Sequence, residues 1–244
     1  MRSLSAHELL EFWEQNLARA PAHRAFELLA GACPDSSLES LAALSIGERD
    51  ARLMALRETV FGGGITGLAT CPACPERLEF SLDSAAIRAQ QKAEPEREID
   101  LSVAGYNLRF RLPNVQDAMA VAAVGDSQTG AGMILRHCLL TAQHEGELVD
   151  PACLPSKVVD LVAQRMADAD PLADIQVALV CPACKHEWHT NFDVVSFFWA
   201  EIEAWASRIL NDVHILASAY SWPEQEILNL SPVRRQYYLQ MIGA

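Results

Sequence analysis

The chain has 244 residues, and half of them are apolar or aromatic, which is enough to bury one large core or two small ones. Its 32 acidic residues outnumber 19 basic ones, and the net charge of −13 argues against a general nucleic-acid binder and against a protein of anionic membrane surfaces. No apolar run reaches the roughly 18 residues of a transmembrane helix, and acidic residues interrupt the N-terminus before a signal region forms. We therefore expect a cytoplasmic protein.

The N-terminal region, residues 1–62, is predicted to be helical. Ser5 with Glu8, and Ser45 with Glu48, have the spacing of a capping box, in which side chains satisfy the free backbone groups of a helix start. Apolar residues recur at helical spacing after each box, and a further helix is expected over 21–30. The glycines at 62–64 predict a tight joint and not a phosphate loop, because no Gly-Lys-Ser/Thr follows.

One tetrapeptide, Cys-Pro-Ala-Cys, occurs twice, with the two copies 110 residues apart. Each copy follows an apolar run, and at equal offsets after it Leu78 corresponds to Trp188 and Asp83 to Asp193. The repeat predicts a strand, a knuckle turn, a returning strand and an aspartate that caps a helix. We assign the two copies to the regions 63–91 and 175–193.

The four cysteines of these knuckles are predicted to bind one structural Zn²⁺ ion. Cys-x-x-Cys places two thiolates within reach of one tetrahedral ion, so two copies complete a four-ligand site. The predicted fold class is accordingly α+β and mostly helical, with a split zinc-ribbon-like β core. Such a closed site leaves no coordination position for a catalytic water. The predicted ligands are Cys71, Cys74, Cys181 and Cys184.

Alternatives to this zinc site remain open at the level of sequence. The knuckle cysteines could form disulfides within or between the pairs, or remain reduced without metal. His186 or His189 could replace a cysteine, although four cysteines already complete the shell. The unpatterned cysteines Cys33, Cys138 and Cys153 are interpreted as packing residues.

Residues 92–174 are predicted to be an insertion between the two half-ribbons. After a polar linker, alternating apolar residues on both sides of Gly105 predict a β-hairpin. A helix is expected from Asn114, interrupted over Gly125–Gly132 and resumed over 133–143, and another helix is expected from Ser156.

Two polar groups of the insertion are candidate sites. Asp168, Asp170 and Asp174 could bind a divalent cation, but their spacing lacks the glycine and terminal glutamate of a calcium loop and fits a solvated helix end. His137 and Cys138 could suggest a nucleophilic pair, but adjacent residues of one helix point apart.

The C-terminal region, residues 194–244, is predicted to contain one long helix to about Tyr220 and two short ones that begin near Ser221 and Ser231. Consecutive aromatic residues at 197–199 cannot share one helix face, so the helix is either buried on several sides or binds a partner. The candidate partner-binding residues are Phe198, Trp199, Trp205, Trp222, Arg234 and Arg235.

The C-terminal third contains a series of closely spaced motifs: Asp212–Ala217, Tyr220–Glu224, Glu226–Leu228, Leu230–Pro232, Arg234, Arg235, Tyr238 and Leu239. Together with the Cys-Pro-x-Cys pairs and Phe61-Gly62, these motifs resemble the T4-like phage baseplate proteins, also named baseplate hub assembly chaperones, of contractile tails and extracellular contractile injection systems. The resemblance implies a non-enzymatic protein that assists or forms the baseplate and binds baseplate, hub or spike proteins, and it assigns no catalytic residue.

Two other classes of function are alternatives to a baseplate role. A zinc-ribbon adaptor in transcription or nucleic-acid handling is compatible with the knuckles, but the acidic charge and the absence of a basic stripe oppose it. An enzyme is not expected, because no Ser/His/Asp order, glycine-rich phosphate loop or carboxylate pair stands out.

Overall fold

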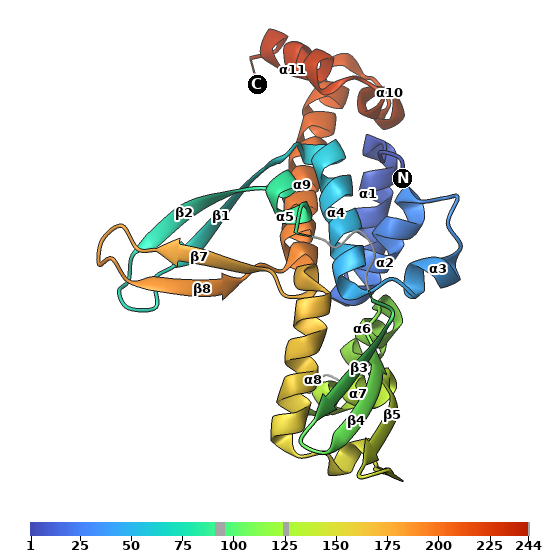
Figure 1. Cartoon of the computed structure of the whole chain (residues 1–244). Coiled ribbons are helices and arrows are strands. Elements are labelled where there is room, and N and C mark those ends of the chain that lie inside the picture. The colour runs from blue at the N-terminus through green and yellow to red at the C-terminus, as the bar shows by residue number, and fades with distance from the viewer. Residues whose placement is uncertain (91–95, 124–126, 244) are drawn as a thin grey trace.

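The computed structural model describes residues 1–90, 96–123 and 127–243. Helices dominate and short antiparallel hairpins lie between them, which confirms the predicted mixed α and β class. Figure 1 shows a helical body around the long helix α9, an arm of two β-hairpins that projects from it, an inserted sheet-and-helix module at one end and two short helices at the other. Residues 92–95 of the predicted linker and residues 125–126 of the predicted helix interruption lie outside the described part of the chain.

The body packs the N-terminal helices against α9 around one large hydrophobic core. Both predicted capping boxes are present, with Ser5 capping α1 and Ser45 capping α4. The aromatic run of α9 is buried on several sides: Phe198 is 1% exposed and packs edge-on against Phe61, and Trp199 packs edge-on against Phe12. The helices of the body are α1 (Ala6–Asn16), α2 (Pro21–Ala32), α3 (Leu38–Ala42), α4 (Ile46–Phe61) and α9 (Val194–Tyr220).

The arm consists of two separate two-stranded sheets that have the same register. Ala69 lies opposite Leu78 in one hairpin, and Leu179 lies opposite Trp188 in the other. Inward-facing apolar residues of both hairpins join the body core, so the base of the arm is anchored by burial. The strands are β1 (Gly64–Thr70), β2 (Arg77–Asp83), β7 (Gln176–Val180) and β8 (Glu187–Asn191).

Each hairpin leads directly into a helix capped by the predicted aspartate. Asp83 accepts from the Ala85 backbone N–H at the start of α5 (Ser84–Arg88), and Asp193 accepts from the N–H groups of Val195 and Ser196 at the start of α9. The cap thus fixes where each returning strand ends and sets the direction in which the chain re-enters the body.

The insertion forms a four-stranded antiparallel sheet, in the order β3-β4-β5-β6, with a hydrophobic core of its own. The prediction of a helix over 133–143 is wrong in its second half, because α7 ends at Cys138 and the next residues form β5. Pairing with β4, a contact distant in sequence, overrides the helical pattern there. The elements are β3 (Glu98–Val103), β4 (Tyr106–Arg111), α6 (Val115–Ala122), α7 (Ser127–Cys138), β5 (Leu139–His144), β6 (Glu147–Leu148), the 3₁₀ turn η1 (Pro151–Cys153), α8 (Ser156–Ala169) and the 3₁₀ turn η2 (Pro171–Ala173).

The C-terminal helices lie across the end of α9 and share a third apolar cluster with it (Figure 1). Ser221 ends α9 in the left-handed conformation, with φ of 58°, and Ser231 caps the last helix, whose first residue is Pro232. These two helices are α10 (Glu224–Leu228) and α11 (Pro232–Met241). Among the described helices, none is both long enough and apolar enough to cross a membrane.

Candidate metal centre

The two hairpin turns meet at the far end of the arm (Figure 1). In each turn the backbone N–H of the first cysteine donates to a carbonyl five residues later: Cys71 to Glu76, and Cys181 to His186, both at 2.9 Å. This hydrogen bond folds the chain back so that both thiols of a knuckle project from one side. The repeated local sequence therefore builds two equivalent half-sites.

The turns differ at the position after the second cysteine. Lys185 has a φ of 61°, in the left-handed region, whereas the first knuckle has Pro75 there, whose ring holds φ near −65°. The two turns therefore present their thiols through different local backbone paths while keeping the same closing hydrogen bond.

The four sulfur atoms form one compact group. The Cys71 and Cys184 Sγ atoms are 3.7 Å apart, the Cys74 and Cys181 Sγ atoms are 3.6 Å apart, and all four lie within 4.8 Å of one another. With metal–sulfur distances of about 2.3 Å, the sulfurs of a tetrahedral site lie about 3.8 Å apart. A disulfide would need about 2.05 Å, and all seven cysteines are free. The spacing therefore matches four ligands of one ion.

The protonation of these thiols is interdependent because they lie so close together. The backbone N–H of Glu76 lowers the pKa of Cys74, but burial and the neighbouring cysteine thiols outweigh it and raise that pKa to about 12. The pKa of Cys181 is lowered to about 7, mainly because the backbone N–H of Cys184 donates to its sulfur. Burial opposes this shift. A cation that replaces the thiol protons would remove the repulsion among four adjacent thiolates.

The donor set also indicates what kind of metal the cluster can hold. Four sulfurs suit a soft or borderline ion in a closed tetrahedral shell and leave no position for substrate or water. His186, an alternative ligand in the sequence analysis, stacks on Trp188. Neither His186 nor His189 belongs to the cluster of four cysteines. Within the described residues, no other set of three or more potential ligands comes this close together.

A family model described as T4 bacteriophage base plate protein matches residues 23–199. The chain belongs to this family of phage baseplate proteins. The match includes both hairpins, the insertion and the start of α9, whereas the resemblance noted in the sequence was strongest in the C-terminal third. Searches of curated proteins and of solved structures give no match.

The residues expected to bind partners of this baseplate protein have different environments. Phe198, Trp199 and Arg235 are buried, so their side chains are not available on the surface. Arg235 instead pairs with Asp212 at 3.2 Å and fastens α11 to α9. These three side chains therefore pack within the chain itself, and their contact with a partner stays a prediction.

The other three retain exposed surface. Trp205 is half-buried between two apolar clusters, and Trp222 stacks on Tyr220 with ring centroids 4.6 Å apart. Arg234 is exposed. For these three, partner contact stays a prediction.

The acidic group of the insertion holds no metal-like arrangement. Asp170 is buried and accepts a hydrogen bond from the Gly47 N–H at 2.9 Å, Asp168 accepts from Gln164, and Asp174 accepts from Gln176 and Asn191. Asp170 therefore has a structural role, because it joins the insertion to the first turn of α4.

The candidate nucleophilic pair, His137 and Cys138, also lies in a structural environment. Cys138 is buried beside Asp117, whose carboxylate binds Arg111 and lies 3.3 Å from the Nδ1 atom of His137. Burial and the Asp117 charge raise the pKa of the Cys138 thiol to about 12, the opposite of what a nucleophile needs. The group ties α6 and α7 to the end of β4.

Sequence reasoning missed Arg57, which lies at the root of the arm. Its guanidinium, 3% exposed, donates to both carboxylate oxygens of Glu201 at 2.6 and 2.7 Å and to the carbonyls of Gly62 and Gly64 at 2.6 and 2.8 Å. One side chain thus joins α4, α9 and the entry to β1. An arginine on a predicted helix gives no sequence signal for this role, because its partners are distant in the chain.

Proposed function

We propose that this chain is a non-enzymatic, zinc-containing assembly factor or baseplate component of a contractile phage tail-like particle, which binds other tail or baseplate proteins. The observation that carries the proposal is the family match over residues 23–199. The geometry supports it, because the polar groups weighed as catalytic are occupied in structural contacts.

The proposed zinc ion has a mechanical role. The two hairpins are separate sheets with no hydrogen-bonded strand pairing between them, and the apolar cluster that they share with the body ends at Leu78, Leu179 and Trp188, just before the cysteine turns. Bound to Cys71, Cys74, Cys181 and Cys184, the ion would join the two tips and hold the arm as one rigid projection. A projection of fixed shape is suited to docking in an assembly, since less conformational freedom is lost on binding.

The alternative, a nucleic-acid adaptor, has less support. Zinc ribbons that bind nucleic acid place basic residues along the contact face, and this chain carries 13 more acidic than basic residues. We expect no salt-dependent retention on a nucleic-acid column.

The proposal is tested in the particle itself. Deleting the gene is expected to leave tails without complete baseplates in electron micrographs, and the wild-type gene supplied in trans is expected to restore them. Elemental analysis of the purified protein is expected to give one zinc per chain. Mass spectrometry of finished particles separates a retained component from a factor that leaves. Normal baseplates in the deletion strain would refute the role in assembly, and a metal-free, folded protein would refute the zinc centre.

A further inference from the structure

The last helix, α11, has an inner face that is fully used. Leu239 is buried in the apolar cluster shared with α9, Tyr238 packs edge-on against Trp222, and Arg235 pairs with Asp212. These contacts fix the orientation of the helix on the end of α9. Its opposite face is therefore held outward in a defined position.

That outer face is apolar and unpaired. Val233, Tyr237 and Met241 are spaced four residues apart and are 67%, 62% and 72% exposed, so they form one stripe along the helix. A hollow of about 460 Å³ lies along it, lined by Pro232, Val233, Gln236, Tyr237 and Gln240. Exposed apolar stripes of this kind mark interaction sites more often than isolated surface residues do.

The helix that carries the stripe is positively charged, in contrast to the protein as a whole. The helix contains no acidic residue, and Arg234 is exposed beside the stripe. A second hollow, of about 400 Å³, continues from Pro232 and Gln236 to Arg208 on α9. Neither Arg208 nor Arg234 forms an ion pair with a described residue. The one acidic residue lining this hollow, Asp212, is already bound to Arg235.

We propose that the outer face of α11 binds an acidic amphipathic helix of another baseplate protein. Apolar side chains of that helix would cover Val233, Tyr237 and Met241, and its carboxylates would reach Arg208 and Arg234. A second copy of this chain is a poorer occupant, because its α11 contains no acidic residue and so offers no carboxylate to Arg208 and Arg234. This inference rests on the proposed function and names the surface that serves it.

The direct test is site-specific photo-crosslinking in cells that assemble particles. With p-benzoylphenylalanine at position 237, the crosslinked peptide is expected to come from another baseplate protein and to contain Asp or Glu beside apolar residues at helical spacing. The same probe at position 148, a leucine of the insertion that is 78% exposed, is the matched control and is expected not to label that peptide. Crosslinks to a second copy, to a basic segment or to no baseplate protein would each overturn the inference.

Substitutions then test the two parts of the surface separately. With the crosslinked protein as the probe, Val233→Glu with Tyr237→Glu is expected to weaken binding at least about tenfold, whereas Leu148→Glu leaves it unchanged. Arg234→Glu is expected to weaken it too, and a Glu→Lys change in the probe is expected to restore it. All of these side chains are exposed, so melting temperatures should stay at the wild-type value. Full binding by the double variant would refute the surface, while the assembly role would still stand if the deletion strain lacks baseplates.

Discussion

At the scale of single residues, the junction between body and insertion depends on one carboxylate. Asp170, at the end of α8, is buried and accepts the hydrogen bond of the Gly47 N–H, a free donor in the first turn of α4. Gly47 is required there, because a Cβ atom built on it would lie 1.9 Å from the Asp170 Oδ1 atom.

We therefore predict that Gly47→Ala destabilises the protein by about 1–3 kcal/mol, since the carboxylate must move and its hydrogen bond is weakened. Gly132→Ala on α7 is the control: a Cβ there meets no atom within 4 Å, and alanine favours helix, so unfolding should be unchanged or slightly harder. Urea denaturation followed by circular dichroism measures the stability of both variants. Equal midpoints would contradict the close contact between Gly47 and Asp170.

A second buried carboxylate gives the protein a pH dependence. Burial raises the pKa of Asp50 from 3.8 to about 6; its ion pair with Arg49 opposes the shift, and the charges of Asp193 and Asp170 add to it. Between these values the folded chain holds a proton that the unfolded chain has released. This group therefore favours folding most below pH of about 4, and its contribution is lost as the pH rises through about 6.

Asp50→Asn removes this titration. The free energy of unfolding of the wild type, measured relative to the variant, is expected to fall by about 3 kcal/mol from pH of about 4 to about 7. Urea denaturation at a series of pH values measures the difference, which cancels the titration of all other groups. Parallel profiles for the two proteins would show that the Asp50 carboxyl is not held protonated.

At the scale of secondary-structure elements, the arm depends on its connections to the helices more than on its own strands. Two-stranded hairpins are marginal alone in water. Here the aspartate caps of α5 and α9 fix the base of each hairpin where its second strand ends, and Arg57 holds the start of β1, at the same base, against α9. Ion pairing and carbonyl binding by one buried guanidinium thus set the direction of the arm.

We predict that Arg57→Lys destabilises the protein by about 2–4 kcal/mol, although the charge is kept, because an ammonium cannot reproduce the planar set of donors to Glu201, Gly62 and Gly64. Arg208→Lys, on the exposed surface of α9, is the matched control and should cost less than about 0.5 kcal/mol. Thermal unfolding of the two variants measures the difference in stability, and equal melting temperatures would contradict the proposed role of the Arg57 guanidinium.

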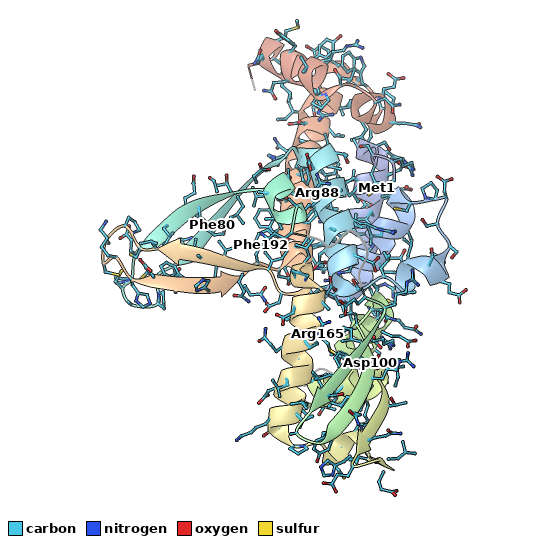
Figure 2. All side chains as sticks on the ribbon, in the orientation of Figure 1. Met1, Phe80, Arg88, Asp100, Arg165 and Phe192 are labelled. Carbon is cyan, nitrogen blue, oxygen red and sulfur yellow. The ribbon has the colours of Figure 1, made fainter. Side chains whose placement is uncertain are left out.

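At the scale of the whole molecule, three hydrophobic clusters divide the stability among the body, the insertion and the C-terminal end. The apolar cluster that the arm shares with the body runs along the arm as far as Leu179 and Trp188, and the four thiols lie beyond it at the tip (Figure 2 labels Phe80 within the arm and Phe192 at its base). Loss of a metal at the tip should therefore be a local event.

Removing the metal with a chelator is expected to abolish the protection of backbone amides from hydrogen exchange in β1, β2, β7 and β8. The amides of α9 and of the insertion are expected to stay protected. Hydrogen exchange followed by mass spectrometry measures both outcomes. Cys184→Ser should give the same pattern, and Cys153→Ser, an exposed cysteine outside the cluster, should behave as the wild type. Uniform loss of protection would show that the ion supports the entire fold and not only the arm.

Features that depend on short-range chemistry could be predicted from the sequence. The Ser and Asp caps, the two matched hairpins and the ligand spacing of the knuckles all follow from residues within about one or two turns of each other, and each is present in the structure. The sequence also indicated the family, and the family match over residues 23–199 confirmed it, although that match ends before the C-terminal motifs that carry most of the resemblance.

Which residues serve contacts between distant segments became evident in the folded chain. The fold made β5 a strand by pairing it with β4, buried Phe198 and Trp199 in the core, gave Arg57 its partners, and left the outer face of α11 uncovered. These outcomes depend on free energies gained between segments that are remote in the chain, and residue spacing carries no information about which segments meet. The meeting of the two Cys-x-x-Cys turns is the one long-range contact that local chemistry did predict, because four thiolates complete a shell that two cannot.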